Sequence, residues 1–160
     1  MNPNSSAIRR AVLLVTVITS VTGPAAMAAA RVCDLITATE ASAALGVSVA
    51  AGTAVLGESG DQLCQYVDPR YGMLAITLAD NHGREKYEKA KSKIQKDAAI
   101  TPENISGVGD EAVFANVSKG VSELLVVKGD KSIAIALGGR AVNSSKEALK
   151  DLARKALSRL

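Results

Sequence analysis

The sequence predicts an α+β domain: an antiparallel sheet of about five strands with helices packed on it. The first observation is a pair of apolar runs, 123–128 and 131–137, joined by Gly129 and Asp130. A two-residue loop led by glycine favours a type II′ hairpin, because glycine adopts the positive φ of the first turn position. The second observation is a capping box before each of two helical segments near the ends of residues 31–160. The third is the helical spacing of apolar residues over 146–160.

The central hairpin also predicts its own register. The short loop places Leu124 opposite Ile135, and it places Val126 opposite Ile133. The other side of the hairpin, which begins with Leu125, is apolar as well, so we expect both faces of the sheet centre to be covered. A slip by one residue would exchange the two faces, and the sequence alone leaves that alternative open.

Residues 1–30 are expected to form a signal peptide. Arg9 and Arg10 precede an apolar run at 11–21, a Gly-Pro pair follows, and small residues within 26–30 offer several cleavage sites. The alternative is an uncleaved anchor, since the apolar stretch is long enough to span a membrane. The helix-breaking Gly-Pro pair favours cleavage. We therefore expect an exported protein, periplasmic or extracellular, with at most peripheral membrane contact.

Without this leader, residues 31–160 are expected to form a single globular domain. The full chain has 19 basic and 16 acidic residues; removing Arg9 and Arg10 leaves 17 against 16. This near balance does not favour a nucleic-acid partner. The chain has no tryptophan and only four aromatic residues, Tyr66, Tyr71, Tyr87 and Phe114. Base-stacking platforms need more aromatic rings than that.

Cys33 and Cys64 are expected to form a disulfide, because an even cysteine count in an exported protein indicates pairing. Closing a loop of this length stabilises the fold by about 3–4 kcal/mol on the chain-entropy model. A lipidated Cys33 is the alternative. The residues before it do not form a lipobox, because Ala30 and Val32 stand where leucine and a small residue are required.

The elements are expected in the order α-β-β-α-β-β-β-α. Thr37 and Glu40 form the first capping box, and that helix stops at Gly46. The segment from Gly52 to Gly60 is interpreted as a loop. Helix-forming composition predicts the helix at 84–97, and a second capping box, which begins at Ser144, predicts the start of the last helix. The remaining expected elements are strands 63–67, 73–79 and 112–117, the central hairpin, and helices 84–97 and 146–160.

Basic residues concentrate on the last two helices, which hold 11 basic and five acidic residues. If both helices lie on one side of the sheet, as is natural for this fold class, the molecule has a basic side. That side would suit an anionic envelope surface, although lysine also serves simply to solvate exposed helices. The candidate contacts are Lys86, Lys89, Lys93, Lys96, Lys150 and Arg154.

Catalytic and metal-binding patterns were sought in the sequence, and none predicts a site. His82 is the only histidine and follows no catalytic motif, so a hydrolase triad would have to use this one residue. Zinc sites need about four His, Cys or carboxylate ligands. We expect no enzyme, no cofactor and no metal centre.

The loop 107–111 is a candidate binding loop. It combines Gly107 and Gly109 with Asp110 and Glu111, and with Asp130 these acids offer a carrier of a divalent metal or small ligand as an alternative. The loop lacks the spacing of known phosphate or calcium loops. A tight turn, in which the acid caps backbone N–H groups, is the competing interpretation.

Short motifs in the chain resemble domain-of-unknown-function families of small secreted bacterial proteins and lipoproteins. They are Cys33-Asp-Leu-Ile-Thr37, Cys64-Gln-Tyr66, Gly107-Val-Gly-Asp-Glu-Ala112 and Val127-Lys-Gly-Asp130. The resemblance implies a bacterial envelope or secreted setting and a two-cysteine α+β fold. It implies no catalytic residue.

The resulting functional hypothesis is a non-enzymatic exported domain that binds a protein or an envelope component. Its contact surfaces would be the basic helices or the loops at 57–62 and 107–111. The alternatives are the small-ligand or metal carrier and a secreted enzyme inhibitor.

Overall fold

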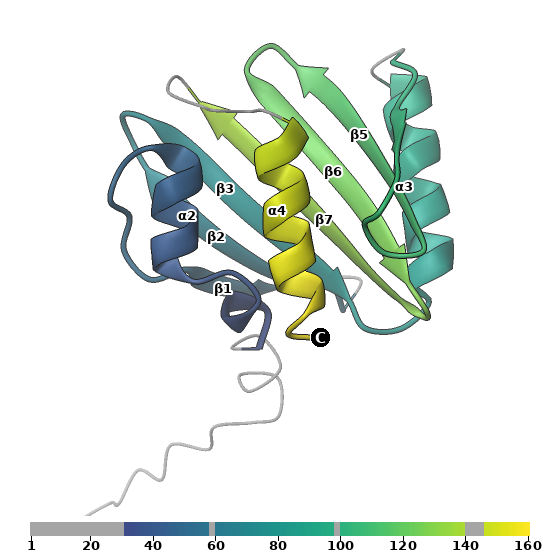
Figure 1. The fold of residues 1–160 in the computed structure, drawn as a ribbon, viewed down its shortest axis with the longest axis horizontal. Helices are drawn as coiled ribbons and strands as arrows, with labels where there is room; N and C mark the ends of the chain where they lie inside the picture. The colour runs from purple at the N-terminus through teal and green to yellow at the C-terminus, as the bar shows by residue number, and fades with distance from the viewer. Residues whose placement is uncertain (1–30, 58–59, 98–99, 140–145) are drawn as a thin grey trace, which may run out of the picture.

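A computed structural model describes residues 31–57, 60–97, 100–139 and 146–160 of the chain; the expected signal peptide lies outside these residues. Its centre is one antiparallel sheet of seven strands (Figure 1). The strands are β1 (Thr53–Leu56), β2 (Gln62–Asp68), β3 (Gly72–Ala79), β4 (Glu103–Ile105), β5 (Glu111–Ser118), β6 (Val121–Lys128) and β7 (Lys131–Gly139). The helices are α2 (Ala38–Leu45), α3 (Gly83–Asp97) and α4 (Lys146–Leu157).

The sheet joins two meanders through its central pair of strands. Its order is β1-β2-β3-β7-β6-β5-β4. Strands β3 and β7 are neighbours in the sheet although α3 and strands β4–β6 lie between them in the sequence. The predicted hairpin register is confirmed: Leu124 pairs with Ile135, and Val126 with Ile133. Gly129 has φ of +59°, the positive value that a type II′ turn requires at its first position.

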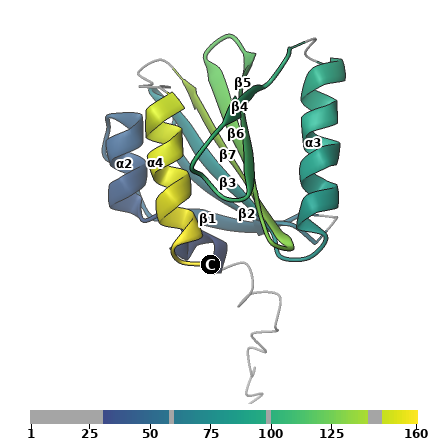
Figure 2. The same ribbon diagram turned by 45° about the vertical axis from the view of Figure 1, so that its right-hand side comes forward.

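Helices cover both faces of the sheet, as expected from the two apolar sides of the central hairpin. The arrangement with all helices on one side, considered for the basic helices, is therefore wrong. Helices α2 and α4 lie on one face, and α3 lies on the other (Figure 2). The physical reason is the apolar second side of the central hairpin. Leu125 and Val127 point away from α4, and α3 buries them under Tyr87 and Ile94.

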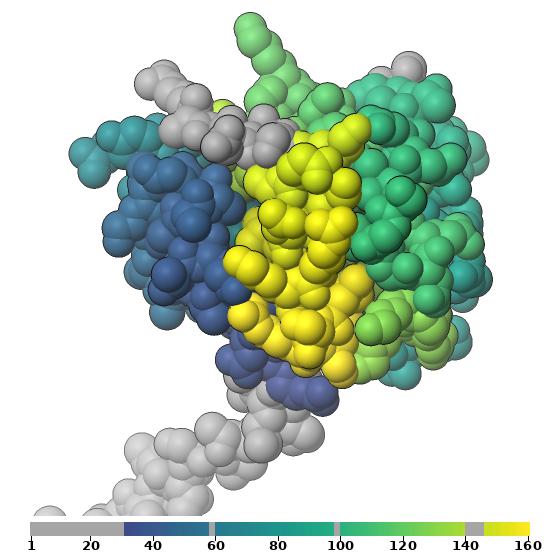
Figure 3. Space-filling view, in the orientation of Figure 1, coloured from purple at the N-terminus to yellow at the C-terminus, as the bar shows by residue number. Residues whose placement is uncertain are grey.

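The main core lies between the sheet and the pair α2 and α4, which close over the front of the molecule (Figure 3). The predicted stripe of α4 is confirmed, because Leu149, Leu152, Ala153 and Ala156 are buried. The sheet side of this core includes one face of the strand pair β2 and β3. Its buried members are Cys64, Tyr66, Leu74, Ile76 and Leu78.

Two short strands were missed in the sequence, so the expectation of about five strands is corrected to seven. Strand β1 lies inside the segment interpreted as a loop, and β4 precedes the glycine turn. Both are three or four residues long and show no alternation of buried and exposed residues. Strands of this length carry no periodic signal, and tertiary pairing alone makes them regular.

A disulfide and a tyrosine fasten the N-terminal segment to the sheet. The predicted bond between Cys33 and Cys64 is present, with an S–S distance of 2.04 Å. The Tyr66 hydroxyl donates to the backbone carbonyl of Cys33 at 3.0 Å and also to that of Ile36. The predicted capping box of α2 is confirmed, since Thr37 and Glu40 bond reciprocally. The second predicted capping box begins at Ser144, outside the described residues.

Candidate binding surface

Among the described residues, half of one sheet face has no helix over it. Helix α3 packs mainly on β5, β6 and β7, and no other described helix lies on the same face of β1, β2 and β3. The cross-strand pairs Val55–Leu63, Gln65–Ala75 and Val67–Met73 fix which side chains point there. We call this region the open face. Its members are Thr53, Val55, Leu63, Gln65, Val67, Met73, Ala75 and Thr77.

The open face is mostly apolar, and none of its eight residues is charged. Four of them are exposed and four are half-buried. Val55 is 45% exposed, Val67 54% and Met73 38%. On the covered half of the same face, Leu125 and Val127 are 2% and 0% exposed. An antiparallel sheet that meets water on one side normally alternates apolar and polar residues. Strands β2 and β3 instead carry apolar residues on both sides.

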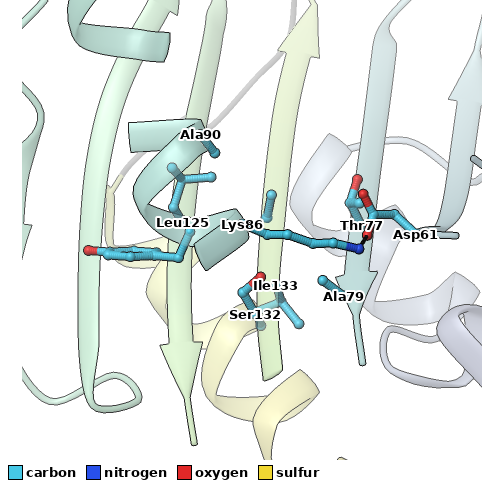
Figure 4. A pocket seen from close by; sticks show the side chains of 10 residues that line it. Asp61, Thr77, Ala79, Lys86, Ala90, Leu125, Ser132 and Ile133 are labelled. Atoms are coloured by element: carbon cyan, nitrogen blue, oxygen red, sulfur yellow. Dashed lines mark hydrogen bonds and ion pairs between the residues drawn. The ribbon is translucent and has the colours of Figure 1, made fainter. Parts of the chain in front are cut away.

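A hollow of about 110 Å³ marks the boundary between the covered and the open half (Figure 4). Thr77 and Ser132 contribute the sheet side, and Ala90 of α3 forms part of the wall. The side chain of Lys86 runs across the hollow from α3 and forms an ion pair with Asp61, just before β2. The hollow therefore lies where the side of α3 meets the open face. We call the change in height between the top of α3 and the open face the step.

Tyr87 lines the same hollow. Burial, helped by the nearby carboxylates of Glu111 and Glu88, raises the pKa of Tyr87 to about 12. Its hydroxyl therefore holds its proton more tightly than that of an exposed tyrosine.

A second hollow, of about 430 Å³, lies at the other end of α3, where Ile94 and Val117 supply apolar walls. Glu123 lines it, and burial raises the pKa of this carboxyl while the charge of Lys93 acts in the opposite direction. Asp97 also lines this hollow.

The loop 107–111 has a structural part in the fold. Gly109 has φ of +62°, and a Cβ there would lie 2.5 Å from Val126 Cγ1. The Asp110 carboxylate accepts a hydrogen bond of 2.7 Å from the Gly129 N–H, which ties the loop to the central hairpin. Glu111 pairs with Arg84 of α3 at 2.7 Å. Gly107, whose φ is +75°, offers its carbonyl to Arg154 at 3.4 Å.

These bonds leave the loop acids apart rather than around a common point. In residues 31–57, 60–97, 100–139 and 146–160, no three His, Cys, Asp or Glu side chains come together as a metal site. His82 is 76% exposed at its side chain, and its Nδ1 lies 3.9 Å from Glu85.

The candidate basic contacts are divided between the two faces of the sheet. Lys86, Lys89, Lys93 and Lys96 belong to α3, whereas Lys150 and Arg154 belong to α4. Lys150 pairs with Glu147 at 3.0 Å, and Arg154 with Asp151 at 3.0 Å. The single basic side considered in the sequence analysis required both helices on one face, and this arrangement does not form it.

Comparison with known proteins adds no family to these observations. No protein-family model, no curated protein and no solved structure matches the chain. Within the described part of the chain, no helix is long and apolar enough to cross a membrane.

The open face is a candidate binding surface that the sequence did not predict. Its signal was present in strands 63–67 and 73–79, where Leu63, Val67 and Met73 are apolar on the side opposite Cys64 and Tyr66. Alternation alone did not reveal it, because a strand covered on both faces has the same composition. Only the position of α3 distinguishes an uncovered apolar face from a buried one.

Proposed function

We propose that this chain is a non-enzymatic binding domain that binds protein through the open face. The observation that carries the proposal is the exposure of Val55, Val67 and Met73 on a sheet face without charged residues. Contiguous exposed apolar surface marks interaction sites in soluble proteins. The open face spans three strands and has a hollow, of about 260 Å³, beside Thr53, Gln65 and Val67. A surface of this kind suits a protein better than a small molecule, which binds in concave sites that bury most of its area.

The other hypotheses find weaker support in the geometry. Docking of one anionic surface onto both basic helices would require α3 and α4 on one face, and they lie on opposite faces. A carrier using Asp110, Glu111 and Asp130 would have to break the bonds that Asp110 and Glu111 make within the fold. An enzyme inhibitor is one kind of protein-binding domain, and it is included in the proposal.

Site-specific photo-crosslinking tests the proposal. A photo-reactive residue replaces Val67 in the full chain, produced with its leader in its native host. A matched chain carries the same residue at Gln95, an exposed, uncharged position of α3. We expect a cross-linked protein product from position 67 and not from position 95. The partner is identified by mass spectrometry, purified, and titrated against the wild-type chain and the Val67→Lys variant.

The titration gives the proposal its quantitative form. A lysine at position 67 would have to be desolvated in the complex, so we expect binding at least about tenfold weaker than wild type. The Gln95→Lys variant should bind like wild type. Equal cross-linking at the two positions, or unchanged affinity of Val67→Lys, contradicts the proposal.

A further inference from the structure

We infer that the protein bound at the open face is a second copy of this chain, packed face to face about a two-fold axis. This inference rests on the proposed function and names its partner. Three features of the described residues support it: the charge pattern of the open face, the step that α3 forms beside it, and the unprotected edge at β1.

The charge pattern makes the open face complementary to itself. A two-fold axis brings the same surface of both copies together, so any charge near its centre would meet a like charge. The open face has none, although 22% of the chain is charged. The neutral amide of Gln65 and the hydroxyls of Thr53 and Thr77 are its polar groups. Interfaces between identical chains are more apolar than other interfaces, and this face has that composition.

The step beside the open face has the depth of one structural layer. Helix α3 stands on the sheet over β5–β7 and ends its coverage at the hollow by Thr77 and Lys86 (Figure 4). Stacked sheets pack about 10 Å apart, and a helix with its side chains is about 10 Å across. A second sheet laid on the open face therefore fits in the layer of α3. By symmetry, the partner's α3 then lies in the layer of the first sheet, beside β1.

The two edge strands of the sheet, β4 and β1, differ in their protection against pairing with another chain. Strand β4 is protected: it follows the buried Pro102 and carries Glu103, which pairs with Lys146 at 2.6 Å. Strand β1 has four exposed residues, and none is charged or proline. Natural sheets normally block exposed edges with such residues. An edge that a partner's helix covers in the assembly does not need this protection.

The hydrogen bonding of β1 shows which of its backbone amides would be shielded by the partner's α3. The Gly57 N–H donates to the Asp61 carbonyl at 2.7 Å, so Gly57 points its polar groups toward β2. The direction of the backbone N–H and C=O groups alternates along an antiparallel pair. The groups of Val55 therefore also point toward β2, and those of Ala54 and Leu56 point away from the sheet. The outward amides exchange freely in the monomer and are shielded when the partner's α3 covers the edge.

The area of the open face predicts a weak dimer. The strands of the open face have four, seven and eight residues and span on the order of 300 Å² on each copy. The total of roughly 600 Å² is below the size of stable interfaces, so the contact between the partner's α3 and β1 has to add to it. We therefore expect dissociation in the micromolar range rather than an obligate dimer.

Sedimentation equilibrium of the exported, disulfide-bonded chain from low micromolar to near-millimolar concentration tests the inference. The wild-type chain should pass from monomer to dimer. Val67→Lys and Met73→Lys should each weaken dimerisation at least about tenfold, because two lysines approach across the axis in a desolvated layer. Gln95→Lys and Asn104→Lys, on α3 and on the protected edge, should leave the equilibrium unchanged. Circular dichroism confirms that each variant is folded.

Hydrogen exchange over the same concentrations gives an independent measurement. Exchange of the Ala54 and Leu56 amides should slow as the dimer forms, and that of Val55 should change little. A wild-type chain that remains monomeric throughout, or Lys variants that dimerise like the controls, overturns the inference. The cross-link from position 67 separates the two proposals: a product of twice the chain mass supports the second copy. A product with a different protein sustains the proposed function and overturns the dimer.

Discussion

Arg159 and Glu40 join the two ends of the described chain in a two-pronged ion pair. The Arg159 guanidinium donates to both Glu40 carboxylate oxygens, at 2.7 and 2.8 Å, and also to the Leu35 carbonyl at 2.8 Å. Glu40 meanwhile completes the capping box of α2 with Thr37. One carboxylate therefore caps the start of α2 and holds Arg159, two residues beyond the end of α4, across 119 positions of sequence.

Glu40→Gln should lower the free energy of unfolding at neutral pH by about 1–3 kcal/mol. The change weakens the bonds with Arg159 and Thr37, and hydrogen bonds to charged groups contribute in this range. Urea denaturation measures the effect. Glu85→Gln is a matched control, since the pair of Glu85 with His82 joins side chains that are 80% and 76% exposed, and exposed pairs contribute about 0–1 kcal/mol. Equal effects of the two substitutions would contradict the role assigned to Glu40.

Glu40 should also make stability fall in acid. The hydrogen bond from Arg159 lowers the pKa of Glu40 to about 2 from the ordinary 4.5, against the opposing effect of burial. A lowered folded-state pKa contributes stability that is present above about pH 4.5 and is lost as the pH falls toward about 2. Urea denaturation across this window should show a smaller decline for Glu40→Gln than for wild type. Parallel curves would be the contrary result.

Glu123 should have the opposite pH dependence. Burial raises its pKa, so the folded state holds this proton more tightly than the unfolded chain. The stabilising contribution is then present below the unfolded value and is lost as the pH rises through the raised folded value. Glu123→Gln should stabilise the protein at neutral pH, by up to about 1 kcal/mol, and have little effect in acid. Thermal melts at the two pH values measure the difference, and a loss of stability at neutral pH would contradict it.

Reducing the disulfide between Cys33 and Cys64 should lower the free energy of unfolding by about 3–4 kcal/mol, from the chain entropy of its 31-residue separation. Denaturation of the oxidised and reduced forms measures this directly. The double variant Cys33→Ala with Cys64→Ala separates loss of the bond from effects of the reductant. Equal stability with and without the bond would show that the N-terminal segment docks without it.

Gly52→Ala should be destabilising by about 1–3 kcal/mol, as for other overpacked positions. A Cβ at Gly52 would lie 2.3 Å from Cys64 Sγ and 2.7 Å from Tyr66 Cζ, so the disulfide or the ring would have to move. Gly57→Ala is the matched control at the other end of β1. A Cβ at Gly57 would have Asp61 O as its nearest neighbour, at 3.3 Å. If both substitutions have the same small effect, the close packing of Gly52 is not a constraint on the fold.

The sequence predicts those elements in which local signals agree with tertiary packing. The α2 cap, the α4 stripe and the register around Gly129 are set by interactions within a few residues, and all three are confirmed. The turn interpretation of 107–111 has the same origin, because Gly109 and Asp110 act on the adjacent hairpin.

The sequence does not predict features that depend on where distant elements pack. The face chosen by α3 follows from Gly83, whose N–H bonds to the Asp130 carbonyl at 2.8 Å and whose Cβ would lie 2.3 Å from the Lys131 carbonyl carbon. That contact, between residues nearly 50 positions apart, fixes where the helix starts over the sheet. The open face is uncovered only because α3 lies where it does. The pattern of apolar residues in β1–β3 therefore does not predict it.

Oxidation of Met73 tests the central claim most directly. Met73 is the only methionine after residue 27 and is 38% exposed on the open face, and an exposed thioether is readily converted to the sulfoxide. A brief peroxide pulse is applied to dilute purified protein and to the intact producing cells, and the sulfoxide fraction at Met73 is measured by mass spectrometry. The account predicts rapid oxidation in the dilute protein and protection in cells, with protection abolished by Val67→Lys. Equal oxidation in both settings would show that nothing covers the open face.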